Sequence, residues 1–287
     1  MFWFIGGTNI QAAIKTVKKL PYQAIYDYAK EASYKHTSAK LLSREINDYS
    51  SKIVEDVKHI PPGSGVALKL SSFYNPHNFN RSNEMFKCVY RILHVNNQTP
   101  IFLDAEQESL REEEHKIYDT LLWTFNTQNV ALYKTYQMYR KDAMNDLVND
   151  LRCNPYQYHG IKLVRGAYMH EDGVKGVLHS NKAATDESYN DAVAHVLSVM
   201  NTNRRIKVLI ATHNNTSIQL ALQLLNKHNR DRVAFAQLLG MNDAASMALL
   251  EKQCQVFKYV PYGSIQETLP YLTRRLYENA DITKYMM

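Results

Sequence analysis

Residues 161–168 read Ile-Lys-Leu-Val-Arg-Gly-Ala-Tyr, and this stretch predicts a buried strand that ends in an active site. Its apolar residues are good β-formers, Gly166 permits a close approach of the backbone, and Ala167 keeps that approach open. Two cations and a tyrosine at the end of a buried strand are costly if they face only neighbouring side chains. The alternative is an ordinary edge strand from which Lys162 and Arg165 extend their charged heads into solvent.

Similar apolar runs alternate with amphipathic helical segments along the chain and make eight strand–helix units. The other expected strands are 24–28, 66–71, 101–104, 130–136, 206–212, 233–238 and 256–260. Their mostly continuous apolar character is typical of parallel strands that are covered on both faces. The pattern predicts one domain over residues 1–287, a single (β/α)8 TIM-like barrel. A doubly wound open sheet is the alternative, but no GxGxxG motif follows the first expected strand.

Composition limits the classes of protein to consider. The chain has 287 residues, 45% of them hydrophobic, and a formal net charge of +6. No apolar run approaches the length of a membrane span, and no secretory signal or organelle presequence is evident. Lysines and arginines are interspersed with acidic residues, which favours a solvated basic surface over a nucleic-acid site. The three widely spaced cysteines indicate a reducing compartment and form no CxxC metal motif.

Polar residues stand at the carboxyl ends of nearly all the expected strands, which is the face that carries the active site in a (β/α)8 barrel. They are Glu31, Lys69, Asp104, Gln137, Lys162, Arg165, Tyr168, Thr212, His213, Asn214, Gln237 and Tyr259. Because so many polar groups would be costly in a purely structural barrel, we expect them to line one site. No second histidine stands at metal-ligand spacing from His213, so no catalytic metal is expected.

The last expected helix, residues 264–279, carries a candidate carboxylate site. Four polar residues on one face of it, at i, i+3, i+4 and i+7, are Tyr271, Arg274, Arg275 and Glu278. Adjacent arginines on an inward face suit a carboxylate, because each guanidinium presents a planar fork of donors. The alternative is a surface ion pair between Arg274 and Glu278, which is common and contributes little. Residues 264–267, Ser-Ile-Gln-Glu, form a capping box that predicts where this helix begins.

Four motifs in the same order resemble the proline dehydrogenase (proline oxidase) family, and most closely its eukaryotic, mitochondrial branch. They are residues 162–168 (KLVRGAY), 211–214 (ATHN), 237–241 (QLLGM) and 271–279 (YLTRRLYEN). The resemblance implies a distorted barrel that binds FAD without a covalent bond and oxidises L-proline to Δ1-pyrroline-5-carboxylate. Electrons would then pass to a quinone. The resemblance also implies a mitochondrial location, on the matrix side of the inner membrane, with room for peripheral membrane association and no nucleic-acid partner.

The resemblance further assigns roles to individual residues. The carboxylate of proline would be held by Lys69, Arg274 and Arg275. Its ring would be surrounded by Tyr168, Leu238, Tyr259 and Tyr271. Glu31 would pair with Arg274 as a gate over the substrate, Asp104 would hold Tyr259, and Asp104 and Lys162 would act in catalysis. Contacts to the FAD would come from Ala105, Gln137, Lys162, Arg165, Gly166, Ala167, Lys182, Thr212, His213, Asn214 and Glu278.

The chemistry of proline oxidation agrees with these residue types. Hydride can leave C5 of proline only when the nitrogen has a lone pair, and the cations of the site disfavour the ammonium form. A cation near the flavin ring also stabilises the negative charge of the reduced cofactor. Tyr271 would crowd C4 of the ring, so hydroxyproline is expected to be a poor substrate. Bacterial relatives usually carry Arg in place of Lys162 and Lys in place of Arg165, so flavin tuning is expected to differ here.

Two other functions remain open from the sequence. Another barrel flavoenzyme would oxidise a different secondary amino acid, although the paired arginines and Tyr271 disfavour substrates that lack a carboxylate. A basic, aromatic-rich nucleic-acid binder would instead be colourless, and its binding to DNA or RNA would depend strongly on salt.

Overall fold

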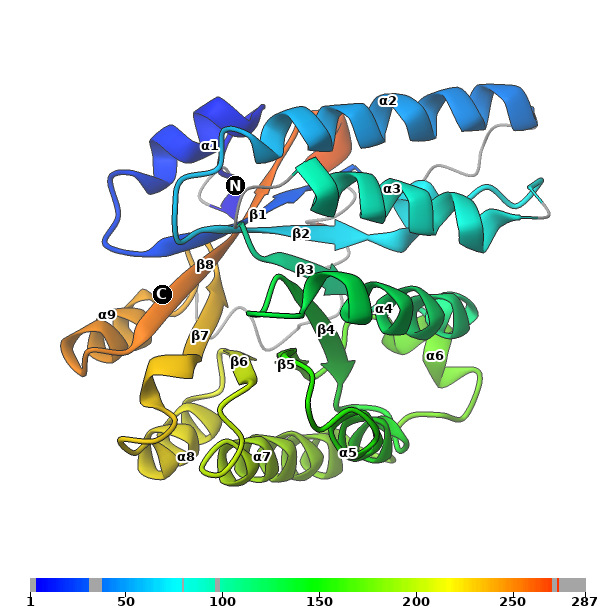
Figure 1. Ribbon diagram of the computed structural model, residues 1–287. Helices are drawn as coiled ribbons and strands as arrows, with labels where there is room; N and C mark the ends of the chain where they lie inside the picture. Colours follow the sequence, from blue (N-terminus) through cyan, green and yellow to red (C-terminus); the bar gives the residue numbers. More distant parts are fainter. Residues whose placement is uncertain (1–3, 31–37, 79, 96–98, 270–272, 274–287) are drawn as a thin grey trace.

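The computed structural model describes residues 4–30, 38–78, 80–95, 99–269 and 273. Its centre is a closed barrel of parallel strands in the order β1 to β8, with β8 pairing back onto β1 (Figure 1). The strands are β1 (Gln23–Tyr28), β2 (Gly65–Lys69), β3 (Ile101–Asp104), β4 (Leu132–Gln137), β5 (His159–Val164), β6 (Ile206–Ala211), β7 (Val233–Leu238) and β8 (Gln255–Tyr262). The predicted (β/α)8 barrel is therefore confirmed, and the open sheet is excluded.

Helices surround the barrel. They are α1 (Ile10–Val17), α2 (Ala39–Val57), α3 (Arg81–Val95), α4 (Arg111–Phe125), α5 (Ala143–Cys153), α6 (Met169–Gly173), α7 (Lys182–Val199), α8 (Asn215–Leu224) and α9 (Asp243–Glu251). In Figure 1, α1, α2 and α3 lie along the top of the view, α5, α7 and α8 lie along the bottom, and the strands run between them. Within the described residues, no helix is both long enough and apolar enough to cross a membrane.

Several strand ends differ from the sequence prediction by one or two residues, and the ends of β2 and β8 show the local cause. β2 stops at Lys69, because Leu70–Phe73 turns into a 3-10 helix. β8 continues to Tyr262 through Pro261, where the prediction ended the strand. Pro261 has no N–H to donate, but its carbonyl accepts a hydrogen bond of 2.8 Å from the Gly6 amide, so this end of the strand stays bonded.

The predicted capping box is confirmed where the last helix begins. The Ser264 amide donates to Glu267 Oε2 at 2.7 Å, and the Glu267 amide donates to Ser264 Oγ at 3.4 Å. Residues 265–269 are helical. Glu267 Oε1 also accepts a hydrogen bond of 2.6 Å from the Tyr28 hydroxyl, which ties this helix to the end of β1.

The period-two alternation of side chains divides the strands into an outer and an inner face. Outward residues pack in two apolar clusters, one under α1 to α4 and the other under α5, α7, α8 and α9. The apolar layer inside the barrel includes Ile25, Ala67, Phe102, Tyr133, Leu209, Ala234 and Phe257. Two residues further along four of these strands, the inward positions become Asp27, Lys69, Asp104 and Tyr259. Lys162 stands at the corresponding position of β5, so apolar packing gives way to polar chemistry at the carboxyl ends of the strands.

Candidate active site

We call the carboxyl-end part of the barrel interior the barrel mouth and define it by Asp27, Lys69, Asp104, Lys162 and Tyr259. A buried ion pair joins β1 and β2 there. Lys69 Nζ donates to Asp27 Oδ1, and the two side chains are 2% and 1% exposed. Each charge stabilises the other, because either one alone would be costly at this depth. Asp27 Oδ2 is buried and has no hydrogen-bond partner among the described residues, and such an acceptor is normally satisfied by water or a ligand.

The second feature of the barrel mouth is a network centred on Asp104. Its carboxylate accepts hydrogen bonds from Lys162 Nζ at 2.5 Å and from the Tyr259 hydroxyl at 2.7 Å. Lys162 Nζ also lies 5.0 Å from the centroid of the Tyr259 ring. Burial disfavours the charged form of Asp104, but Lys162, Lys69 and the two hydrogen bonds outweigh burial and hold its pKa below the usual value. Side chains of β5 and β8 therefore meet across the barrel at one carboxylate from β3.

The ion pair and the network belong to one constellation. Lys69 and Asp104 are register partners on the adjacent strands β2 and β3. Lys69 is also close enough to contribute to the low pKa of Asp104. The structure thus gathers Lys69, Asp104, Lys162 and Tyr259 as the sequence predicted. It adds Asp27, so that two lysines and two aspartates balance each other in charge.

Arg165 lies beside the barrel mouth, between α7 and α8. Its Nε pairs with Asp186 Oδ1 at 2.6 Å, Nη1 donates to Thr212 Oγ1 at 2.7 Å, and Nη2 donates to Ser217 Oγ at 2.9 Å. The guanidinium also packs over the ring of Tyr189, 4.3 Å from its centroid. These contacts fix Arg165 rigidly against the first turns of both helices.

The segment after β5 is anchored to the loops after β3 and β4. Gly166 has φ +131°, and a Cβ there would lie 2.5 Å from the ring of Tyr139, so the predicted close backbone approach is to this ring. The Tyr139 hydroxyl donates to Asp172 at 2.7 Å, and the Glu108 amide donates to the same carboxylate at 2.8 Å. Asp172 is fully buried, and it holds in place the stretch that carries Gly166, Ala167 and Tyr168.

The ends of β6 and β7 carry Thr212, His213, Asn214 and Leu238. Asn214 caps α8 by accepting a hydrogen bond of 3.2 Å from the Ser217 amide. The Leu238 amide donates to His213 Nε2 at 3.4 Å. Burial, followed by the nearby Lys258 and Arg165 charges, lowers the pKa of His213 to about 4. His213 is consequently a neutral imidazole at physiological pH.

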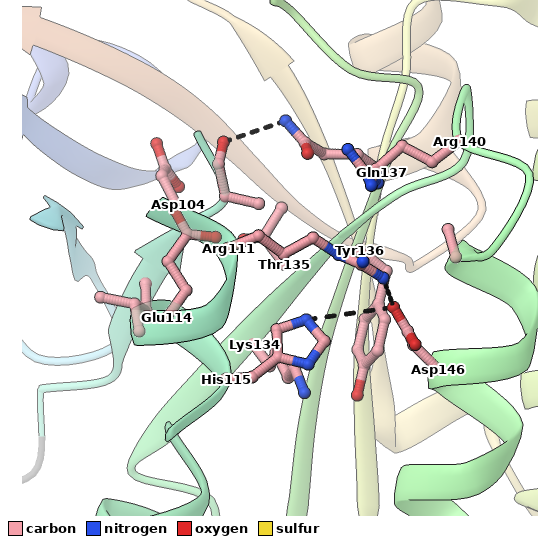
Figure 2. Close-up of a pocket in the computed structure, with 13 residues that line it drawn as sticks. Asp104, Arg111, Glu114, His115, Lys134, Thr135, Tyr136, Gln137, Arg140 and Asp146 are labelled. Atoms are coloured by element: carbon pink, nitrogen blue, oxygen red, sulfur yellow. Dashed lines mark hydrogen bonds and ion pairs between the residues drawn. The ribbon is translucent and has the colours of Figure 1, made fainter. Parts of the chain in front are cut away.

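A small cavity lies where β3 and β4 separate beyond their last register pair, Leu103 with Lys134 (Figure 2). It is bounded by strand-end residues and by α4 and α5, and its volume of about 30 Å³ suits one or two water molecules. Gln137 Nε2 donates to the Ala105 carbonyl at 3.2 Å across this gap, as Figure 2 shows. Burial and then the nearby Glu106 raise the pKa of Glu114, which lines the cavity, well above its usual value. The cavity is too small for an amino acid, so it lies beside the candidate site and is not the site itself.

Comparison with known proteins decides the family. Residues 10–287 match the family model described as Proline dehydrogenase. The chain belongs to the proline dehydrogenase family. It is 32% identical over 217 residues to "Proline dehydrogenase 1, mitochondrial" of Dictyostelium discoideum, and the aligned region covers 70% of this chain and 37% of that protein. It is 30% identical over 200 residues to "Hydroxyproline dehydrogenase" of Xenopus laevis, which covers 65% of this chain and 43% of that protein.

The fold agrees with solved structures. The crystal structure of proline utilization A from Bdellovibrio bacteriovorus inactivated by N-propargylglycine has a TM-score of 0.83 at 19% identity, covering 96% of this chain and 32% of that one. This likeness shows that the barrel fold is shared. The chain spans less than half the length of each protein compared here.

The proline dehydrogenase resemblance also assigns roles to residues that lie outside the described part of the chain. These residues are Glu31, Tyr271, Arg274, Arg275 and Glu278.

The donor set next to β5 and β6 has the chemistry that suits an anionic group such as a diphosphate. α7 and α8 both begin beside Arg165, and helix N-termini attract anions through their free N–H groups and dipoles. Lys182, the first residue of α7, pairs with Asp186 at 2.6 Å and is largely exposed. Arg165, Lys182 and the two helix starts therefore provide a positively charged edge that could hold such a group.

Several residues of the site were missed by reasoning from the sequence. Asp27 could have been found, because it follows Ile25 by two residues and so shares the inward face of an expected strand. Glu106, Asp172 and Asp186 lie in loops or on a helix, where strand periodicity gives no orientation. Their roles depend on which loops the barrel brings together.

Proposed function

We propose that this chain is the catalytic barrel of an FAD-dependent proline dehydrogenase, which oxidises L-proline to Δ1-pyrroline-5-carboxylate. Membership of the proline dehydrogenase family supports this function. The observation that carries it is the barrel mouth, where Asp104, Lys162 and Tyr259 form one buried network next to Lys69. A polar constellation of this kind, above an apolar barrel floor, suits a small amphipathic amino acid.

The residues of the barrel mouth would act first by binding. Lys69, oriented by Asp27, would contribute a donor to the substrate carboxylate. Tyr259, fixed through its hydroxyl by Asp104, would present its ring to the apolar face of proline. Tyr168 and Leu238 would complete the ring pocket from the ends of β5 and β7. These contacts hold the substrate in one orientation and exclude water from its C5 edge.

Bound FAD would supply the hydride acceptor for C5 of the substrate. Lys162, held by Asp104, would keep a fixed positive charge in the barrel mouth, where it stabilises the negative charge that develops during hydride transfer. Neutral His213 and the amide groups near it would provide uncharged hydrogen-bonding groups at the edge of the site. The cofactor itself would be held by the positive edge made by Arg165, Lys182 and the N-termini of α7 and α8, with Ala105, Gln137, Gly166, Ala167, Thr212 and Asn214 next to it.

The charge balance changes one expectation from the sequence. Each described lysine of the barrel mouth is paired with an aspartate, so Lys69 and Lys162 alone do not create the net positive charge that would disfavour the substrate ammonium. Arg274 and Arg275 would supply that charge and most of the affinity for the carboxylate.

The wider setting of the reaction follows from the family. We propose that a quinone re-oxidises the reduced cofactor and that the protein acts in mitochondria, on the matrix side of the inner membrane. The mitochondrial name of the Dictyostelium discoideum relative supports this location.

The test is the visible spectrum of the purified protein before and after L-proline is added without oxygen. We expect a flavin spectrum that bleaches with L-proline and much more slowly with hydroxyproline. Arg275→Met should abolish the bleaching and leave the protein folded. A colourless protein would contradict the FAD assignment. Bleaching by other secondary amino acids but not by proline would contradict the substrate, and comparable bleaching by hydroxyproline would contradict the role of Tyr271.

A further inference from the structure

Glu106 is a buried carboxylate that the proposed mechanism does not use. It follows β3 by two residues and is 4% exposed. Its Oε2 accepts a hydrogen bond of 2.7 Å from the Ser71 amide, and its Oε1 accepts one of 2.6 Å from Ser71 Oγ. Oε1 also lies 3.4 Å from the Tyr168 hydroxyl, which donates to it. All three partners can donate to the carboxylate, but burial outweighs the Ser71 hydrogen bonds and the Lys69 charge and raises the pKa of Glu106 above its usual value.

The partners of Glu106 come from three different strand ends. Ser71 follows Lys69 by two residues, in the 3-10 helix after β2. Glu106 itself follows Asp104 by two residues, and its own amide is fixed by a 2.9 Å hydrogen bond to Glu114 Oε1 of α4. Tyr168 stands after β5, at the start of α6. One carboxylate therefore ties together the segments that carry Lys69, Asp104 and Tyr168.

The lengths of these contacts indicate that Glu106 has two structural roles. The two short bonds to Ser71 fasten the end of β2 to the end of β3, and so fix Lys69 against Asp104. The contact to Tyr168, at 3.4 Å, is longer than an ordinary O–H···O hydrogen bond. This contact orients the Tyr168 ring through its hydroxyl group. The hydrogen bond can shorten when a substrate contacts the ring, because such bonds tighten in complexes.

We propose that Glu106 is a positioning residue, which sets the place of the Tyr168 ring relative to Lys69 and thereby the fit of the five-membered ring of proline. This inference rests on the proposed function. It predicts that loss of the Glu106–Tyr168 contact weakens substrate binding and relaxes discrimination between ring sizes, while the fold is kept.

Glu106→Gln is a selective probe of this contact. The amide oxygen of glutamine can still accept from the Ser71 amide, and its NH2 group can donate to Ser71 Oγ. The Tyr168 hydroxyl then meets an NH2 group, from which it can accept but to which it cannot donate, so the direction of this contact is reversed. Tyr168→Phe removes the contact altogether and is therefore the deciding variant. Glu114→Gln is the matched control, because Glu114 is similarly buried and a glutamine there keeps an acceptor oxygen for the Glu106 amide.

The measurement is the dissociation constant of L-proline, obtained from the substrate dependence of anaerobic flavin reduction by each holoenzyme. Loss of the Tyr168–Glu106 hydrogen bond should raise this dissociation constant roughly two- to tenfold in Tyr168→Phe, and reversal of the bond in Glu106→Gln should raise it by less. The double variant should bind L-proline no more weakly than Tyr168→Phe, because both changes act on one contact. The preference for proline over its four- and six-membered ring homologues should fall as well. Glu114→Gln should change neither quantity.

Several results would overturn the inference. An unchanged dissociation constant and ring-size preference in Tyr168→Phe would do so, as would a double variant in which the effects of the two single changes multiply. An equal effect in Glu114→Gln would indicate general loosening of this region. If Glu106→Gln does not fold, Tyr168→Phe decides alone, and wild-type binding in that variant overturns the inference. Failure of wild-type flavin to bleach with L-proline would overturn the proposed function and this inference together, whereas the other results leave the function standing.

Discussion

Asp104→Asn should destabilise the protein by leaving Lys162 buried without its counter-ion. The carboxylate accepts from Lys162 Nζ at 2.5 Å and from the Tyr259 hydroxyl at 2.7 Å. The Lys162 side chain is 6% exposed, so solvent can offset little of the loss. Removing one partner of a buried pair typically costs about 3–5 kcal/mol. Asparagine keeps one acceptor oxygen, so we expect about 3 kcal/mol, which lowers Tm by about 6–10 °C for a chain of this size.

The assay is urea unfolding at neutral pH, with Asp104→Asn/Lys162→Met as the matched control. If the cost comes from an uncompensated charge, replacing Lys162 with an apolar residue of similar length should restore most of the stability and none of the proline-dependent bleaching. The charge argument would be refuted if the double variant were less stable than Asp104→Asn by as much as Lys162→Met alone destabilises the wild-type protein.

Acid provides a second check on Asp104. Its pKa is lower in the folded protein than in the unfolded chain. Its ionisation therefore stabilises the fold fully above the unfolded value of about 3.9, and this contribution is lost as pH falls through the folded value. The difference in unfolding free energy between wild type and Asp104→Asn should narrow below about pH 4. A difference that stays constant down to the acid transition would show that ionisation of Asp104 does not matter.

Three further variants test the segments that surround the barrel mouth. Gly166→Ala should cost about 2–4 kcal/mol, because φ is +131° and a Cβ would lie 2.5 Å from the Tyr139 ring; wild-type Tm in a thermal melt would contradict this. Asp172→Asn should cost about 1–3 kcal/mol by urea unfolding, because its buried carboxylate accepts from the Tyr139 hydroxyl at 2.7 Å, and the loss should not add to that of Tyr139→Phe. Tyr28→Phe should cost about 1–2 kcal/mol by the same assay, because its hydroxyl donates to Glu267 at 2.6 Å, and an equal loss in a Glu267→Gln background would argue against that contact.

The barrel could be predicted from the sequence because its strands are apolar on both faces. Such strands appear as continuous runs, and eight of them in alternation with helices leave few other topologies. The errors occurred where local chemistry and tertiary context disagree. Proline normally breaks a strand, yet Pro261 stands in β8 beyond the last register pair with β7, Leu238 with Tyr259, where β8 pairs with β1 alone. Residues 70–71 look like strand but form a 3-10 helix, where both donors of Ser71 bond to Glu106.

The candidate site could be predicted in part for a related reason. Inward positions repeat every second residue along a strand. Once the strands are identified, this period places Lys69, Asp104 and Tyr259 together inside the barrel. Which charges pair with one another depends on the shear of the barrel and on loop contacts, which no local pattern encodes. The Lys69–Asp27 pair and the Glu106 contacts are of this second kind.

The pairing of charges also constrains how the proposed site would bind an amino acid. Two aspartates and two lysines at the barrel mouth cancel in net charge, and before substrate binds they would hold one another and the Tyr259 ring in fixed positions. Introducing a carboxylate beside Asp27 and Asp104 is unfavourable unless further cations approach. The sequence offers Arg274 and Arg275 for this purpose, a few residues after a helix start that is tied to β1 by the contact of Glu267 with Tyr28. The affinity for the substrate and the fixed positions of the side chains would then come from different parts of the chain, the arginine pair and the barrel.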